Sequence, residues 1–393
     1  MALQTMLSEG QKLTSELIAF RRALHRHPEL SNQEQETSRM VSAELQRLQI
    51  PHRVQIGGHG IVAELKGSLP GPVIALRADM DALPIQEETE LPFASAIAGV
   101  MHACGHDAHT AILLGAAKLL TIAGMPQRGT VRLLFQSAEE INAGARAMIE
   151  QGALEGVDEI YGLHNLPTLP AGMAATRSGP LMGSVDRIEI KLVGKGGHGA
   201  MPDKSIDPIV CASAIVMSLQ SILSRELPPF EPAVVTIGSI QAGDANNVIP
   251  QYAVMTGTVR TFSPRTQRTM QNRIERIVLR IAEGYRCEAE LRYIEQVPVL
   301  VNHDVCVRHV EDTIDAMIGA AQRTEAEPTM AGEDYALYLE HVPGCFFWLG
   351  SGPAEDAEHA YGLHHPKFNL NEACIPLGAS LLAAIAWNRL ITE

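Results

Sequence analysis

Residues 101–110 read MHACGHDAHT and bring several side chains of metal-binding type within six positions of one another. They are Cys104, His106, Asp107 and His109. Thiolate, imidazole and carboxylate groups are the usual protein ligands of zinc and similar ions. An apolar stretch follows, so we expect a helix over about 107–123, whose positive N-terminal end would favour the thiolate form of Cys104. A buried free cysteine beside surface histidines would give the same local sequence. Assigning a metal site therefore depends on further ligands elsewhere in the chain.

Length, charge and cysteine usage bound the class of protein. At 393 residues the chain exceeds the size at which single cores stop growing, so we expect two domains. The net charge of −14 argues against nucleic acid or an anionic membrane as a partner. We see no apolar run typical of a secretory signal, no stretch approaching a membrane span and no disulfide framework among the six cysteines. We therefore expect a cytoplasmic protein with free thiols.

Short apolar runs between glycine and proline indicate the strands of a parallel or mixed sheet. Helical spacing predicts helices over 8–26 and 33–48. Because strands and helices alternate, we predict an α/β layer fold. The predicted strands lie at 61–65, 72–81, 130–136, 159–165 and 344–350.

Polar residues fall at or just after the ends of several of these strands. Open α/β sheets build their sites at the carboxyl ends of their strands. The polar residues therefore indicate one shared crevice. They are Asp79, Asp81, Glu139, Glu140 and His164.

The middle of the chain has a different order of elements. Strand and helix patterns from about 185 follow the order βαββαβ, which is the split motif of a ferredoxin-like sandwich. The first pattern resumes after about 300, so this part looks inserted, with short hinges that would permit closure over a ligand. We predict a first catalytic segment at 1–184, an inserted domain at 185–298 and a second catalytic segment at 299–393.

An ordered set of motifs covers essentially the whole length of the chain. The set resembles the peptidase M20 family of metallohydrolases, specifically the amidohydrolase branch with hippurate hydrolases, N-acyl-amino-acid deacylases and auxin-conjugate hydrolases. Its members are RADMDALP at 77–84, MHACGHDAHT at 101–110, FQSAEE at 135–140, HNLP at 164–167, GKGGHGAMP at 194–202, NNVIP at 246–250, GTVRTF at 257–262, AGEDY at 331–335 and LHHPKF at 363–368.

The resemblance implies a two-domain α/β fold, with a metallopeptidase-like catalytic domain and an inserted ferredoxin-like lid or dimerisation domain. It also implies that two divalent ions are held by Cys104, His106, Glu140, His164 and His364. His364 is preferred to His365 because the family's ligand stands two residues before the proline. Asp79 and Asp81 would orient the ligands. This donor set suits zinc, manganese, cobalt or nickel.

The adjacent carboxylates at 139 and 140 suggest a division of labour. Successive side chains of an extended segment project to opposite sides, so Glu140 can bind metal while Glu139 faces the substrate. By resemblance Glu139 is the general base. It would take a proton from a water shared by the two ions and deliver it to the leaving amine.

The inserted domain contributes further residues by resemblance. His198 would reach across a dimer interface and stabilise the oxyanion in the other subunit's site. Asn246 and Arg260 would hold the carboxylate of the substrate, and Gly332 would bring backbone close to it. Asp203 stands where the family often has histidine, which leaves the details of the lid near His198 open.

The sequence therefore predicts a dinuclear metal-dependent amidohydrolase that splits small N-acyl amino acids into a carboxylic acid and a free amino acid, acting as a homodimer through the lid domain. One alternative is a metallo-dipeptidase or aminoacylase of the same superfamily that acts on peptides. Another is a non-catalytic protein that binds conjugates or metal on the same scaffold.

Overall fold

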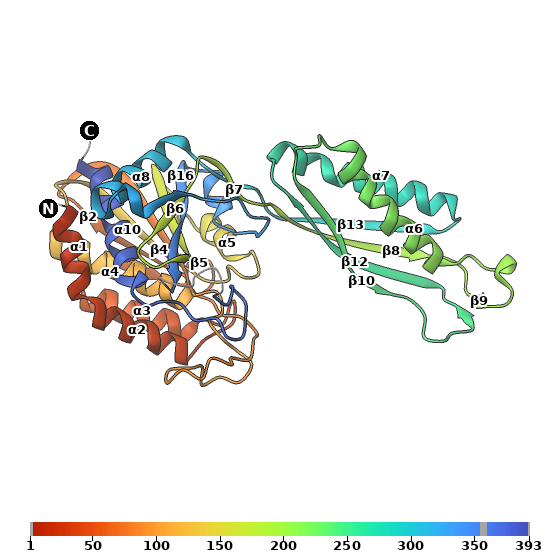
Figure 1. Cartoon of the computed structure of the whole chain (residues 1–393), viewed down its shortest axis with the longest axis horizontal. Coiled ribbons are helices and arrows are strands. Elements are labelled where there is room, and N and C mark those ends of the chain that lie inside the picture. Colours follow the sequence, from red (N-terminus) through yellow and green to blue (C-terminus); the bar gives the residue numbers. More distant parts are fainter. Residues whose placement is uncertain (1–2, 354–359, 392–393) are drawn as a thin grey trace. The chain divides into compact units, whose positions relative to one another are not determined.

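The computed structural model describes residues 3–353 and 360–391, and divides the chain into two compact units (Figure 1). Unit 1 comprises Met1–Leu181, Val301–Glu327 and Asp334–Glu393, and unit 2 comprises Met182–Leu300 and Pro328–Glu333. The division predicted from the sequence, into catalytic segments at 1–184 and 299–393 and an inserted domain at 185–298, stays a prediction.

Unit 1 is built on an eight-stranded mixed sheet in the order β1-β2-β4-β3-β5-β16-β6-β15. The four central strands β4, β3, β5 and β16 run parallel, which confirms the predicted mixed α/β sheet. Their carboxyl ends therefore meet at one edge. The strands are β1 His52–Val54, β2 Ile61–Lys66, β3 Leu69–Asp79, β4 Arg128–Gln136, β5 Glu159–Pro170, β6 Ala174–Thr176, β15 Arg323–Glu325 and β16 Gly344–Gly352.

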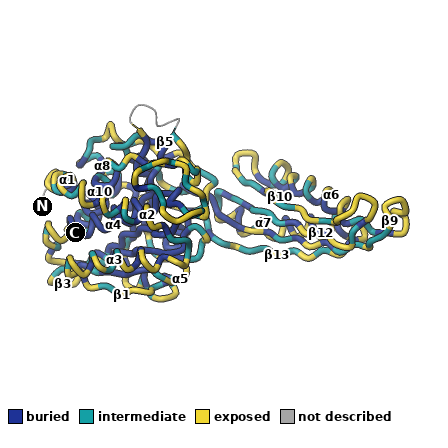
Figure 2. The backbone as a smooth tube through the Cα atoms, turned by 90° about the horizontal axis from the view of Figure 1, so that it is seen from below, coloured by how far each residue is buried: buried dark blue, intermediate teal, exposed yellow. Residues whose placement is uncertain are grey.

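The helices of unit 1 cover this sheet, and two of them, α4 and α10, are buried over most of their length (Figure 2). Both are apolar on nearly all sides, as helices enclosed by a core must be. The helices are α1 Leu3–Lys12, α2 Thr14–Arg26, α3 Gln35–Arg47, α4 His106–Ala123, α5 Gly144–Glu150, α8 Asp304–Ile318, α9 Ala336–Leu339 and α10 Cys374–Ile391, with a 3-10 turn at Ala320–Gln322.

The structure corrects two expectations about helices. The single helix predicted at 8–26 is two helices, because the amide of Leu13 bonds to both Glu9 O and Gly10 O in a tight turn. Among the described residues, two helices are long and apolar enough to cross a membrane by length and composition, although the sequence suggested none. Cys374–Ile391 is 78% buried inside unit 1, as a core helix is, and Pro208–Glu226 is 33% buried in unit 2.

Unit 2 has the predicted βαββαβ order. Its four-stranded antiparallel sheet has the order β10-β12-β8-β13, and the two helices share one hydrophobic core with it. Asp207 and Ser263 cap α6 and α7, each followed by proline at the first helical position. The elements are β8 Val185–Val193, α6 Pro208–Ser221 with a π-helical turn at Ile222–Glu226, β10 Ala233–Gln241, β12 Tyr252–Thr261, α7 Pro264–Gly284 and β13 Glu288–Val297.

Two short ribbons complete the described strands. One joins β9 to β11, and the other joins β7 to β14 where the chain passes between the units. A 3-10 turn at Pro202–Lys204 follows β9. The ribbon strands are β7 Gly179–Met182, β9 Gly197–His198, β11 Val248–Ile249 and β14 Leu300–Asn302.

The packing of α4 against α10 and α2 yields a prediction about Gly115. A Cβ added at Gly115 would lie 2.7 Å from Ala379 Cβ and 2.8 Å from Leu17 Cδ1. Gly115→Val should therefore lower the free energy of unfolding by about 1–3 kcal/mol through overpacking. Urea unfolding followed by far-UV circular dichroism measures this. The matched control is Gly284→Ala at the end of α7, where no atom lies within 4 Å of an added Cβ, and it should not destabilise. Equal midpoints for Gly115→Val and wild type would contradict the prediction.

Candidate metal centre

The turn into α4 presents two candidate ligands from one short segment. Gly105 precedes the helix with φ +91°, a conformation that favours glycine. A Cβ at this position would lie 2.3 Å from Asn165 Nδ2, which donates to Cys104 O at 2.6 Å. The backbone therefore turns sharply at Gly105, and Cys104 and His106 lie on either side of it.

The first group of candidate ligands combines this turn with the end of β5. Cys104, His106 and His164 are all buried, and one potential ligand atom from each lies within 4.8 Å of the others. Cys104 Sγ is 3.3 Å from His164 Nε2. His164 Nδ1 donates to Asn165 O at 2.8 Å, so its Nε2 carries the lone pair of the ring, which faces Cys104 Sγ.

A second group brings in the turn after β4 and the segment before α10. It comprises Cys104, Glu140 and His364, again within 4.8 Å. Glu140 Oε1 lies 3.8 Å from His106 Nε2 and 3.5 Å from His364 Nε2. Every ligand predicted from the sequence thus belongs to one of two overlapping groups. His365 instead accepts from the backbone amide of Lys367 through Nδ1.

Two atoms at the centre of these groups give a direct test of whether a metal fits. Within the described residues, His106 Nε2 and Glu140 Oε1 are buried and have no hydrogen-bond partner. Leaving such an atom unsatisfied costs about 1–3 kcal/mol. A cation would satisfy both, because both are metal-ligand atoms and they face each other. The donor set therefore fits a divalent metal centre.

The thiol of Cys104 leads to the same conclusion by a different route. Burial raises its pKa well above the usual range, and the Glu140 carboxylate raises it further. A divalent metal bound at Sγ would favour the thiolate form.

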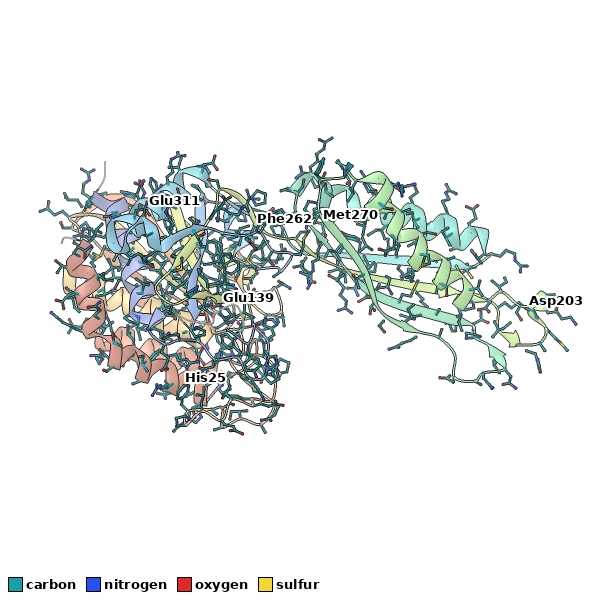
Figure 3. The ribbon with its side chains drawn as sticks, in the orientation of Figure 1. His25, Glu139, Asp203, Phe262, Met270 and Glu311 are labelled. Atoms are coloured by element: carbon teal, nitrogen blue, oxygen red, sulfur yellow. The ribbon has the colours of Figure 1, made fainter. Side chains whose placement is uncertain are left out.

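Glu139 and Glu140 differ from the expectation in their backbone. They lie in a turn after β4, with Ala138 at φ +56° and the amide of Asn142 bonded to Glu139 O at 2.7 Å. The prediction of an extended segment is therefore wrong, because β4 already ends at Gln136. Glu139 is buried in unit 1 (Figure 3), and its carboxylate belongs to a group with His106 and Glu140.

Asp81 holds two of the candidate ligands in place. Its Oδ1 accepts from His106 Nδ1 at 3.1 Å, which leaves the Nε2 lone pair of His106 available for a metal. Its Oδ2 accepts from the Glu140 amide at 3.0 Å and from Ser31 Oγ at 2.6 Å. Contacts of this kind fix the tautomer and orientation of a metal ligand.

Asp79 organises the neighbouring histidine and a buried arginine. It accepts from His109 Nδ1 at 2.7 Å and from Arg77 Nη1 at 2.7 Å. His109 Nε2 accepts from the Asn165 amide at 3.0 Å, so both ring nitrogens of His109 are engaged within the protein. His109 therefore supports the site and has no free lone pair for an ion.

Sequence reasoning missed Arg77, which contacts Asp79, and two residues that Arg77 contacts in turn. Arg77 also donates to Gln136 Oε1 and to Asp334 Oδ1, each at 2.9 Å, and Asp334 accepts from the amide of Ala145. Arg77, Gln136 and Asp334 stand inside the RADMDALP, FQSAEE and AGEDY motifs, so the signal was present. Their mutual contacts depend on the folding of distant segments.

One further group has the composition of a metal site but not its chemistry. Glu159, Cys306 and His309 have potential ligand atoms within 4.8 Å of one another. However, Arg389 binds the Glu159 carboxylate through Nε at 2.9 Å and Nη2 at 3.1 Å, and Tyr161 OH donates to it at 2.7 Å. The carboxylate is satisfied within the protein, so we assign no metal there.

The remaining predicted residues lie in unit 2, at two separate places. His198 is in β9 opposite Val248 of β11, and Asn246 is in the exposed turn before β11. Arg260 lies near the end of β12, where it is half-buried, and a Cβ added to Gly332 would be 3.2 Å from its Nη1.

The strand β12 separates these two places. It runs from Tyr252, close to the ribbon, to Arg260, a span of roughly 25 Å at the usual rise per residue. Figure 3 labels Asp203 and Phe262, which follow His198 and Arg260 in the sequence, at opposite ends of unit 2. The structure thus groups Asn246 with His198 and does not bring it to Arg260 within one chain.

Comparison with known proteins gives consistent matches. The model of peptidase family M20/M25/M40 matches residues 75–388. An N-acetylcysteine deacetylase of Bacillus subtilis is 46% identical over 94% of this chain and 96% of its own length. An Arabidopsis thaliana protein named IAA-amino acid hydrolase ILR1-like 2 is 39% identical over 98% of this chain and 88% of its own length. A solved Bacillus subtilis structure, described as a dinuclear metal-binding peptidase of the M20 family, is 41% identical with a TM-score of 0.85, covering 98% of this chain and 100% of the other.

The contacts of Asp81 predict a loss of metal affinity in Asp81→Asn. An amide at this position cannot accept from His106, Ser31 and Glu140 together, so we expect metal affinity to fall by about 10–100-fold. Competition with a chromogenic chelator for zinc or cobalt measures this. Asp158→Asn is the control, because Asp158 makes a similar contact to the Val73 amide at the other end of β3. Wild-type affinity in both variants would show that Asp81 does not support the ligands.

Proposed function

The chain belongs to peptidase family M20/M25/M40, and from that premise we propose that it cleaves N-acyl amino acids into a carboxylic acid and a free amino acid. Membership makes it a metal-dependent hydrolase of amide bonds. The observation that carries the proposal is the pair of facing ligand atoms, His106 Nε2 and Glu140 Oε1. Neither has a hydrogen-bond partner among the described residues, and the Glu139 carboxylate belongs to the same group.

We propose that two divalent ions are held by Cys104, His106, Glu140, His164 and His364. When bound, such ions polarise the scissile carbonyl and make water more acidic. The soft thiolate together with imidazoles favours zinc, manganese, cobalt or nickel over magnesium or calcium. Asp81 keeps the imidazole of His106 in orientation, and Asp79 holds the neighbouring imidazole of His109, which is not one of the proposed ligands.

Glu139 moves the proton in the proposed reaction. Its carboxylate takes a proton from the attacking water and passes it to the nitrogen of the leaving amine, which departs as the free amino acid. Glu139 is buried, with 7% of the residue exposed, so access of bulk water to the carboxylate is restricted. Burial also strengthens its electrostatic interactions with the reacting groups.

We propose that Arg260 and Gly332 receive the carboxylate of the substrate. Burial lowers the pKa of Arg260 from its usual value because the guanidinium is poorly solvated, and a bound carboxylate would restore the lost favourable contacts. Gly332 leaves room beside the guanidinium, since any side chain there would meet Val185 and Arg260.

We propose further that His198 and Asn246 serve the site of a second copy of the chain. The separation along β12 supports this, because residues roughly 25 Å apart cannot both contact one small substrate from the same chain. A homodimer removes this conflict. We also propose a cytoplasmic location, which the free state of all six cysteines supports.

A peptide substrate is the second candidate. It is favoured by the description of the 41% identical Bacillus subtilis structure as a peptidase. Both candidates need Glu139 and the ligands equally, so only the preferred acyl group distinguishes an N-acyl amino acid from a dipeptide.

The first experiment measures amine release from N-acetyl, N-benzoyl and indole-acetyl amino acids and from dipeptides. Metal-stripped protein is reloaded separately with zinc, manganese, cobalt and nickel. We expect metal-dependent turnover of N-acyl amino acids, and a loss of about 10²–10⁴-fold in Glu139→Gln, which keeps the shape but not the basicity. Turnover of dipeptides alone would favour the second candidate. Stoichiometric binding without turnover by any metal form would indicate a binding protein.

The dimer proposal predicts complementation between two inactive variants. His198→Ala and Glu139→Ala should each lack activity, and mixing them with subunit exchange should restore roughly a quarter of wild-type activity, since half of the dimers are mixed and each has one complete site. Amine release measures recovery, and native mass spectrometry of a tagged variant verifies exchange. If exchange occurs and no activity returns, His198 does not act across the interface.

A further inference from the structure

The turn that carries Glu139 and Glu140 contains a strained residue. Ala138, between β4 and Glu139, has φ +56°, in the left-handed region that costs a non-glycine residue about 1 kcal/mol or more. Such a residue persists only where surrounding contacts determine its conformation. The contacts made by Ala138 therefore set the position of the two carboxylates that follow.

The amide of Ala138 is held by a buried carboxylate from a distant part of the chain. Glu34 Oε1 accepts from the Ala138 amide at 2.8 Å, and the Glu34 side chain is fully buried. The position of Glu34 is itself fixed, because it precedes α3 and its carbonyl accepts from the Ser38 amide. Glu29 anchors the same helix start by accepting from the amides of Glu36 and Thr37.

The other contacts of the turn do not involve the amide of Ala138. The carbonyl of Ala138 accepts from Ala143 and Gly144, and Asp81 accepts from the Glu140 amide. The first pair closes the turn on itself, and Asp81 fixes its far side. Glu34 alone among the described residues bonds to the amide of Ala138, where the chain leaves the regular geometry of β4.

We propose that Glu34 is a positioning residue, whose carboxylate oxygen holds Ala138 in the left-handed conformation and thereby aims Glu139 and Glu140 at the metal centre. The proposal rests on the proposed function, because it assigns Glu34 to the turn that bears the base. Glu34 does not touch the substrate in this role, so its loss changes the rate of the chemical step rather than substrate binding.

The role needs an acceptor oxygen and not a charge. Burial raises the pKa of Glu34 to about 7, although backbone amides, including those of Glu34 itself and Ala138, act in the opposite direction. Its second oxygen, Oε2, makes no hydrogen bond to the residues that the structure describes. Glutamine keeps the Oε1 acceptor and can place its amide at Oε2, whereas alanine removes the acceptor.

The experiment compares Glu34→Gln and Glu34→Ala, with Glu36→Ala as the matched control. Glu36 lies on the same helix start but is exposed and pairs with Arg39. We expect kcat to fall about 100-fold in Glu34→Ala with KM nearly unchanged, as for a misplaced catalytic group. Glu34→Gln should stay within about threefold of wild type, since its acceptor is retained. Glu36→Ala should match wild type in both constants.

Hydrogen exchange gives a readout that does not depend on activity. In the metal-loaded protein, the peptide containing Ala138 should exchange faster in Glu34→Ala and at the wild-type rate in Glu34→Gln. Adding Ala138→Gly to Glu34→Ala should recover part of the lost kcat, because glycine adopts φ +56° without strain. This second variant also guards against a simple loss of folding in Glu34→Ala.

The outcomes separate this inference from the proposed function. The positioning role would be overturned by a wild-type kcat in Glu34→Ala, or by equal losses of kcat in Glu34→Ala and Glu34→Gln. An active wild-type protein would leave the proposed function intact in either case. A wild type without amide hydrolysis would overturn the proposed function. In that case the positioning role would still be supported if the Ala138 peptide exchanged faster in Glu34→Ala but not in Glu34→Gln. Unchanged exchange in Glu34→Ala would overturn it.

Discussion

The carboxylate of Asp81 connects two candidate ligands that the chain supplies from separate elements. It accepts from the imidazole of His106 on α4 and from the backbone of Glu140 after β4, while Ser31 bonds to its second oxygen. A metal centre needs ligands fixed to within fractions of an ångström, and loop residues rarely achieve this alone. Asp81 provides the rigidity because it follows β3, a central strand paired on both sides. The geometry of the site is therefore a consequence of the parallel sheet.

Burial makes this arrangement costly in the absence of cations. Cys104, His106 and Asp79 are buried, and Cys104 and His106 lie near the carboxylate of Glu140. Arg77 balances part of the negative charge from behind, through Asp79 and Asp334. Bound metal ions would balance the charge at Glu140 and at the thiolate of Cys104. The same groups that would bind the ions thus also create the need for them.

The sequence predicted much of the fold because its signals are local. Buried strands, the βαββαβ order and the polar residues at strand ends each depend on a few neighbouring residues. Contacts between distant segments carry no such local signal. Glu34 bonds to an amide 104 positions away, and Arg77 bonds to Asp334 across 257 positions. The turn at Glu139 was missed for the same reason, since contacts with Glu34 and Asp81 stabilise it against the extended conformation that FQSAEE suggests locally.

The negative charge of the chain bears on how it would select a carboxylate-bearing substrate. A net charge of −14 repels anions at long range, but physiological salt screens exposed charges beyond about 8 Å. Selection must therefore come from close contacts. Arg260 is suited to this because it is half-buried, where screening is weak, and because an arginine fork matches the two oxygens of a carboxylate. A substrate that lacks the carboxylate would leave this guanidinium poorly solvated, so the proposed site would discriminate against neutral amides.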